Sequence, residues 1–88
     1  MPSDAIPVTR LEALLEELID AQERKLRRLG ERIVPGITLD DLLAPDDVPA
    51  LAADRDFMYE DGVLAGMMAV RTAVRAWAAA ARSDPGDG

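Results

Sequence analysis

GVLAGMMAVRTAVRAWAAAA, residues 62–81, is the stretch that decides the fold. Apolar residues recur in it at steps of four and three, the spacing of a contact seam between packed helices. The seam consists of Val63, Met67, Val70, Val74, Trp77 and Ala81. One residue earlier runs a stripe of glycine and alanine only: Gly62, Gly66, Ala69, Ala73, Ala76 and Ala80. We therefore predict one long helix, from about Phe57 to about Ala81, with two adjacent surfaces that other helices can approach.

A second long helix precedes this one in the chain. The sequence T-R-L-E, residues 9–12, has the form of a capping box with Thr9 as the cap, and the pair Pro35-Gly36 ends the pattern. Acidic residues fill the first half of this segment and basic residues the second half, which suits the helix dipole. Its seam residues are Leu11, Leu15, Leu18, Gln22, Leu26, Leu29 and Ile33. The pattern predicts a helix from about residue 11 to about residue 34.

The segment between the two helices, residues 35–56, cannot be one continuous helix. Three prolines interrupt it: Pro35, Pro45 and Pro49. We predict one short helical turn capped by Thr38 and another capped by Asp46 or Asp47, with Pro49 in its first turn. Asp56 is the predicted cap of the second long helix. The connection carries enough leucine, isoleucine and valine to lie on the helices.

These elements predict a single all-α domain over residues 1–88, with flexible tails at 1–8 and 83–88. The two long helices match in length and have complementary charge patterns when they run antiparallel, so we expect a helical hairpin. A hairpin buries one stripe of each helix, and the last helix has a further surface to cover. We therefore expect two hairpins to form a homodimeric four-helix bundle. The alternative is a monomer whose connecting segment closes the bundle.

The dimer contact is predicted to lie on the last helix. Its expected residues are Gly62, Val63, Gly66, Met67, Val70, Ala73, Val74 and Trp77. Trp77 is expected to be an interface anchor, since large aromatic side chains contribute most to such contacts. For Gly62 and Gly66 a second interpretation is equally open, namely that they relieve crowding where the connection crosses the start of the helix.

Composition excludes several classes of function. The 88 residues include no cysteine and no histidine, which removes thiolate metal sites and the commonest general base. A net charge of −7 disfavours nucleic acid as a partner, because phosphate binding needs a basic surface. Residues 1–8 do not resemble a signal peptide, and Arg71 and Arg75 interrupt the apolar stretch 63–81. We expect a cytoplasmic protein without a membrane span.

Two carboxylate clusters are the candidates for chemistry. Residues 40–61 contain eight carboxylates and a single base, Arg55, but their spacing does not match a calcium loop. The stretch E-E-L-I-D resembles the first half of the magnesium-binding pattern of all-helical nucleotide pyrophosphohydrolases, and the second half is missing. The metal-site candidates are Glu16, Glu17, Asp20, Glu60 and Asp61. Most of these acids also suit helix caps and first turns.

The sequence therefore favours a small interaction or assembly protein without catalytic activity and without a cofactor. Two alternatives stay open. One is a metal-dependent enzyme similar to the nucleotide pyrophosphohydrolases. The other is an acidic module that docks on a basic protein partner through residues 40–61.

Overall fold

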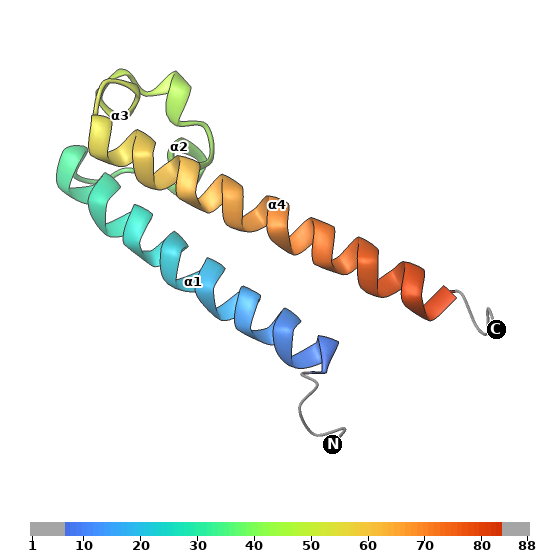
Figure 1. Cartoon of the computed structure of the whole chain (residues 1–88). Coiled ribbons are helices and arrows are strands. Elements are labelled where there is room, and N and C mark those ends of the chain that lie inside the picture. Colours follow the sequence, from blue (N-terminus) through green and yellow to red (C-terminus); the bar gives the residue numbers. More distant parts are fainter. Residues whose placement is uncertain (1–6, 84–88) are drawn as a thin grey trace.

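The chain folds as a hairpin of two long helices joined by three short helical segments (Figure 1). The structure is a computed structural model and describes residues 7–83. Helix α1 spans Val8–Ile33 and helix α4 spans Arg55–Ser83. Between them lie α2 (Leu39–Leu43), the 3-10 helix η2 (Pro45–Asp47) and α3 (Pro49–Ala52). The described residues contain no strand, which confirms the all-α hairpin. The predicted tails lie almost wholly outside the described residues.

The start of α1 differs from the prediction. Pro7 is the N-cap, and its carbonyl accepts hydrogen bonds from the backbone N–H groups of Arg10 and Leu11, at 3.0 and 3.2 Å. Thr9 lies inside the first turn, and no side chain caps the helix. The capping box at Thr9 is therefore wrong, because the turn has already closed on the Pro7 carbonyl.

The end of α1 is a tight turn that the sequence marks clearly. The Ile37 N–H donates to the Val34 carbonyl at 3.0 Å, across Pro35 and Gly36. Gly36 has a φ of +83°, in the region that glycine adopts without steric cost. Proline followed by such a glycine is typical of a type II turn, which redirects the chain after α1.

The caps of the connection are partly as predicted. Thr38 caps α2 in a full capping box, in which its hydroxyl accepts from the Asp41 N–H at 3.1 Å. Pro49 occupies the first turn of α3, but the N-cap is Val48 and no side chain caps it, so the assignment to Asp46 or Asp47 is wrong. Those two aspartates belong to η2 instead.

The cap of α4 lies two residues before the predicted one. The carboxylate of Asp54 accepts from the Phe57 N–H at 2.8 Å, and Asp56 lies in the first turn. Asp56 is therefore not the cap, because α4 begins at Arg55, before it.

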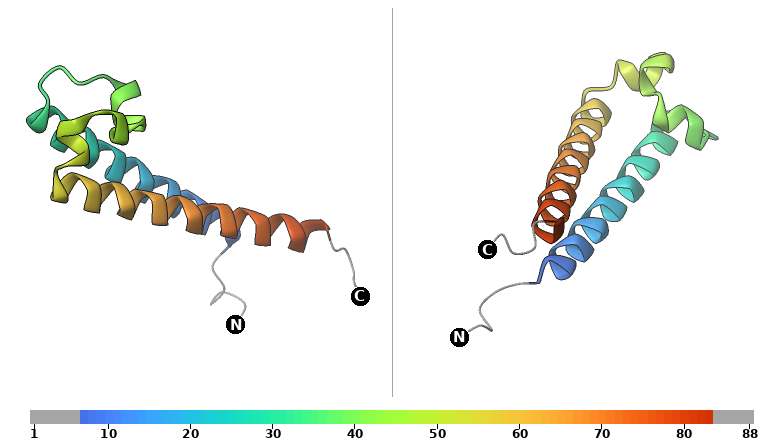
Figure 2. Two further views of the ribbon diagram at one scale, coloured as in Figure 1. Left: turned by 90° about the horizontal axis from the view of Figure 1, so that it is seen from above. Right: turned by 90° about the vertical axis from the view of Figure 1, so that its right-hand side faces the viewer.

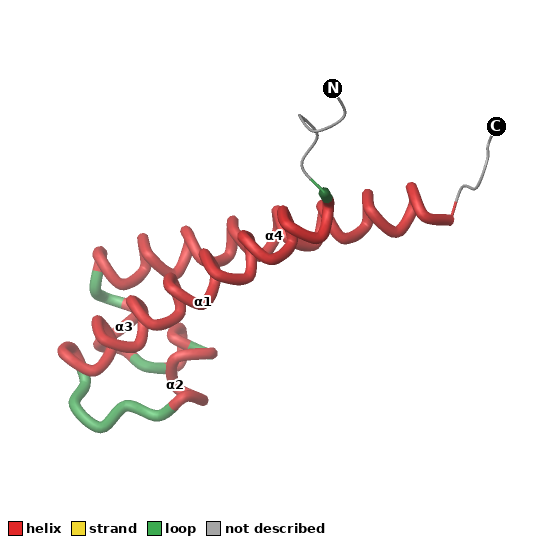
Figure 3. The backbone as a smooth tube through the Cα atoms, turned by 90° about the horizontal axis from the view of Figure 1, so that it is seen from below, coloured by secondary structure: helices red, strands yellow, loops and turns green. Residues whose placement is uncertain are grey.

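The core lies at the end of the hairpin where the connection folds back. Leu26, Leu51 and Phe57 form a buried cluster that joins α1, α3 and the start of α4. Partly buried side chains surround it: Leu29, Ile33, Val34, Ile37, Leu42, Val48, Met58 and Leu64. Figure 3 shows α2 and α3 gathered at this end, while α1 and α4 extend away from it. The other half of the hairpin has a much smaller core, with Ile19 and Ala78 as its buried apolar side chains.

Close approach of the connection to a long helix occurs at Gly30 of α1. A Cβ atom at Gly30 would lie 2.6 Å from Leu42 Cδ2 and 3.6 Å from Phe57 Cε2. At Gly62 and Gly66, in contrast, no atom lies within 4 Å of the position of a Cβ. The interpretation that these two glycines relieve crowding under the connection is therefore wrong for the described chain.

Two groups of ion pairs hold the helices antiparallel. Glu16 near the start of α1 pairs with Arg71 and Arg75, at 3.0 and 2.6 Å. Lys25 further along α1 pairs with Glu60 near the start of α4, at 3.0 Å. The predicted charge complementarity is thus present, although exposed pairs of this kind each contribute only ~0–1 kcal/mol.

The stripe of α4 that faces α1 is not the predicted seam. It consists of Phe57, Leu64, Arg71 and Ala78, at intervals of seven residues, and Phe57 and Ala78 are buried. The seam residues lie to one side of this stripe. Val63, Met67 and Val74 are half-buried, whereas Val70 and Trp77 are exposed. The hairpin therefore leaves much of the seam uncovered.

We predict that Leu51→Ala destabilises the protein far more than Leu43→Ala. Leu51 is fully buried, and removing such a side chain costs about 2–5 kcal/mol. Leu43 is 73% exposed, so the same change there should cost less than about 1 kcal/mol. Urea unfolding followed by circular dichroism measures both. Equal shifts of the two midpoints would show that the Leu51 cluster does not dominate stability.

Candidate functional site

The two sides of the hairpin can be told apart by their ion pairs. Residues seven apart on a helix lie on the same side. Leu11 and Leu18 share a line with Lys25 on α1, and Met67 and Val74 share a line with Glu60 on α4. Because Lys25 pairs with Glu60, these two lines border the same side of the hairpin.

The opposite side is marked by Glu16 and Arg75. Glu16 lies in line with Glu23 on α1, and Arg75 lies in line with Met68 and Asp61 on α4. This is the side on which α2 packs, because the leucines of α2 line one groove together with Glu23, Asp61 and Met68. Figure 2 shows the connection on one side of the layer formed by the two long helices. The Lys25–Glu60 side has no such cover among the described residues.

The uncovered side carries a continuous apolar surface, which we call the apolar face. It consists of Leu11, Leu14 and Leu18 of α1 and Tyr59, Val63, Met67, Val70, Val74 and Trp77 of α4. Four of its side chains are at least half exposed: Leu14 at 51%, Tyr59 at 69%, Val70 at 51% and Trp77 at 60%. Such contiguous apolar patches mark sites of interaction, whereas isolated exposed apolar residues do not. The predicted interface residues Gly62, Gly66 and Ala73 are exposed along its edge.

Glu60 is the centre of the polar cluster that borders the apolar face. The Nε2 group of Gln22 donates to the Glu60 side chain at 2.8 Å and to its backbone carbonyl at 2.9 Å. The hydrogen bond from Gln22, and then the contact with Lys25, lower the pKa of Glu60 below its ordinary value, against a smaller opposing effect of burial. Gln22 is itself buried, so this hydrogen bond also satisfies a polar group inside the helix contact.

Glu16 is the centre of the second polar cluster. Both of its oxygens accept from Arg71 Nη1, at 3.0 and 3.3 Å, and Arg75 Nη2 donates to it at 2.6 Å. Arg71 Nε is buried and has no acceptor among the described residues. Glu16 thus supplies a negative charge next to two arginines of α4, Arg71 and Arg75.

The metal-site candidates do not come together. Glu16 and Glu60 lie in separate ion-pair clusters on opposite sides of the hairpin, and Glu17 and Asp20 are exposed. Among residues 7–83, no group of three or more metal-ligating side chains is close enough to hold an ion. The residues proposed for a pyrophosphohydrolase-like site therefore lack the shared geometry that two bridging cations need.

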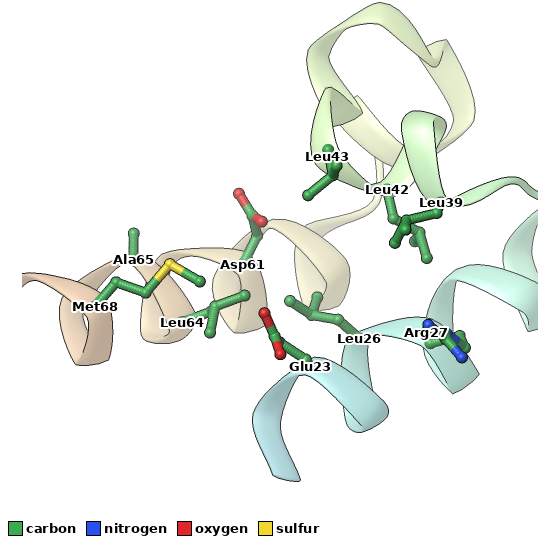
Figure 4. Close-up of a pocket in the computed structure, with 10 residues that line it drawn as sticks. All are labelled: Glu23, Leu26, Arg27, Leu39, Leu42, Leu43, Asp61, Leu64, Ala65 and Met68. Atoms are coloured by element: carbon green, nitrogen blue, oxygen red, sulfur yellow. The ribbon is translucent and has the colours of Figure 1, made fainter. Parts of the chain in front are cut away.

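A groove lies on the other side of the hairpin, between α1, α2 and α4 (Figure 4). It has a volume of about 500 Å³ and is open to solvent. Ten residues line it: Glu23, Leu26, Arg27, Leu39, Leu42, Leu43, Asp61, Leu64, Ala65 and Met68. Of the metal-site candidates, only Asp61 contributes to it. One signal in the sequence points to this groove, the leucine-rich turn of α2, but no pattern indicates its partners on the long helices.

One helix passes a test for membrane spans by length and composition. The segment Arg55–Arg82 has a mean hydropathy of 1.2 over its best 18 residues, and 6% of that window is buried. A single helix of this kind is weak evidence for a span, although the core helices of soluble proteins that share this length and composition are mostly buried. Arg71 and Arg75, both paired with Glu16, weigh against a span through lipid.

No protein-family model, no curated protein and no solved structure matches this chain. The candidate sites are the two surfaces described above, the apolar face and the groove.

We predict that Glu60 contributes to the acid sensitivity of the fold. Its pKa is lowered in the folded state, so its contribution is present at neutral pH and is lost as the pH falls through the lowered pKa. The Glu60→Gln variant should be less stable than wild type at pH 7 and should lose less stability on acidification. Urea unfolding at a series of pH values below 7 measures this. Glu17→Gln, at an exposed carboxylate outside both clusters, is the control, and parallel pH profiles for wild type and Glu60→Gln would contradict the prediction.

We predict that magnesium or manganese at millimolar concentration leaves the Tm unchanged. A cation present at a hundred times its Kd would stabilise the folded state by about 2.7 kcal/mol, which raises the Tm of a domain of this size by about 10–20 °C. Differential scanning calorimetry with and without each cation measures the shift. An increase in Tm of that size in the wild type, together with its loss in the Glu16→Gln variant, would contradict this prediction and support a metal site at Glu16.

Proposed function

We propose that this chain is a small assembly protein that acts as a homodimer, in which the apolar faces of two hairpins pack together as a four-helix bundle. The observation that carries the proposal is the apolar face, which runs over both long helices and is uncovered in the single chain. Such a dimer would serve as an adaptor or accessory subunit, and within residues 7–83 no group of three or more metal-ligating side chains is assembled.

The half of the hairpin that lies away from the connection has a small core, and this supports the proposal. Beyond the Leu51 cluster, the helices bury only Ile19 and Ala78 among their apolar side chains, while Leu14, Val70 and Trp77 stay exposed nearby. The described structure is also extended, with a radius of gyration of 17.5 Å against about 12 Å for a compact domain of this length. A second hairpin would supply the missing half of an ordinary helical core.

The composition of the apolar face suits a second copy of the same chain. Its α4 residues have the 4-3-4-3 spacing of helix–helix seams, and the glycine and alanine stripe beside them lets a partner helix approach closely. The ion pair of Lys25 and Glu60 lies on its border, as polar groups do at the rims of protein interfaces. A twofold arrangement brings the same patch of both chains together, so one sequence can supply both surfaces.

A membrane is a poorer partner for the same face. The chain has a net charge of −7, which opposes contact with anionic lipid surfaces.

We predict that the wild-type protein has a solution mass of about 19 kDa, twice the 9.5 kDa of one chain. Val70→Glu places a charge in the centre of the apolar face and should shift the mass to that of one chain. Thr72→Glu adds the same charge to an exposed position of α4 outside the face and should leave the dimer intact. Light scattering coupled to size-exclusion chromatography, with circular dichroism to check helix content, measures both variants.

Two results would overturn the proposal. One is a wild-type protein that stays at the mass of one chain at all accessible concentrations. The other is a dimer that tolerates Val70→Glu as well as Thr72→Glu, which would place the contact elsewhere. A monomer that cofloats with neutral phosphatidylcholine vesicles would assign the apolar face to lipid instead.

A further inference from the structure

The groove between α1, α2 and α4 lies on the side of the hairpin opposite the apolar face, so the proposed dimer leaves it accessible. Its base is formed by Leu26, Leu64 and Met68 of the two long helices, and its outer wall by the leucines of α2. Two of those leucines are strongly exposed, Leu39 at 58% and Leu43 at 73%. Figure 4 shows Leu39, Leu42 and Leu43 on α2, across the groove from Leu64 and Met68.

The charges around this groove are mostly negative. Glu23 and Asp61 line it from opposite helices, and neither belongs to an ion pair within residues 7–83. Arg27 is the single base in the lining. The groove also lies against the segment 40–61, which carries eight carboxylates and one base.

The shape of the groove fits a helix better than a small molecule. It is partly open to solvent, whereas most ligand sites bury the greater part of a small molecule. Amphipathic helices bind apolar grooves by inserting residues i, i+3, i+4 and i+7, and a volume of about 500 Å³ accommodates several leucine-sized side chains. Methionine at the base of the groove suits a surface that adapts to varied apolar side chains.

We propose that this groove binds a basic amphipathic helix of a protein partner. The apolar side of that helix contacts Leu39, Leu43 and Met68, and its lysine or arginine residues meet Glu23 and Asp61. This inference names a class of partner for the adaptor role, but it does not depend on the homodimer, since the two surfaces lie on opposite sides of the hairpin. Dimerisation would present two grooves and allow two partner helices to be bound at once.

Fluorescence polarisation with a designed peptide tests this proposal on the full chain. The probe is a labelled helix of about 18 residues with leucines at i, i+3, i+4 and i+7 and lysines along both borders. We expect saturable binding that weakens as salt is added, because part of the attraction is between charges. A second peptide has the lysines replaced by glutamates, and a third has the first composition in scrambled order. Both should bind at least tenfold more weakly.

Matched variants locate the binding surface. Leu43→Ala should weaken binding about fivefold or more, whereas Leu14→Ala, at an exposed leucine of the apolar face, should leave it unchanged. Asp61→Asn should weaken binding and reduce its salt dependence, whereas Asp56→Asn removes the same charge from outside the groove and should have little effect. Circular dichroism of each variant separates loss of binding from loss of folding.

Three outcomes would overturn the proposal. The first is equal binding of the basic and scrambled peptides, which would indicate attraction to charge without a groove. The second is equal binding of the glutamate peptide, which would remove the charge complementarity. The third is a loss of binding in Leu14→Ala with retention in Leu43→Ala, which would move the contact to the apolar face. A monomeric protein that still binds the basic peptide would refute the dimer and retain this inference.

Discussion

Two helices packed side by side can bury only one stripe of each, and the rest of this structure depends on that constraint. On α4 the buried stripe is Phe57, Leu64, Arg71 and Ala78, so the apolar seam beside it stays outside. The connection adds one more layer, but only on one side and only at one end (Figure 2). Both candidate binding surfaces, the apolar face and the groove, are formed by side chains that these two layers leave uncovered.

The Leu51 cluster and the ion pairs have different roles in holding this arrangement. Leu26, Leu51 and Phe57 are buried together, and this cluster ties the connection to the hairpin. The pairs of Glu16 and Glu60 are partly exposed and contribute less energy, but they favour the antiparallel direction of α4 against α1. In the observed rotation of α4, Val70 and Trp77 are exposed, and Asp61 and Met68 line the groove.

The sequence predicted the elements of this fold well and their ends less well. Helix periodicity, the Pro35-Gly36 turn, the Thr38 cap and the antiparallel charge pattern are local properties, and the structure confirms them. Thr9, Asp46, Asp47 and Asp56 are plausible caps by composition, yet a backbone carbonyl or a neighbouring residue takes their place. Several residues near a helix start can cap it, and only the path of the chain selects one.

For the candidate sites too, some properties follow from the sequence alone and others from the tertiary structure. Heptad spacing and the small-residue stripe determined that α4 has more packing surface than one partner helix can cover, because side-chain period is a local property of a helix. Only the tertiary structure decided which stripe α1 covers, because that depends on the rotation set by contacts between residues far apart in sequence, such as Gln22 with Glu60. For the same reason the sequence could group Glu16, Glu17 and Asp20 on one helix, but it could not show that Glu16 pairs with two arginines. The groove joins Glu23, Leu43 and Asp61 from three elements, and no local pattern contains all three.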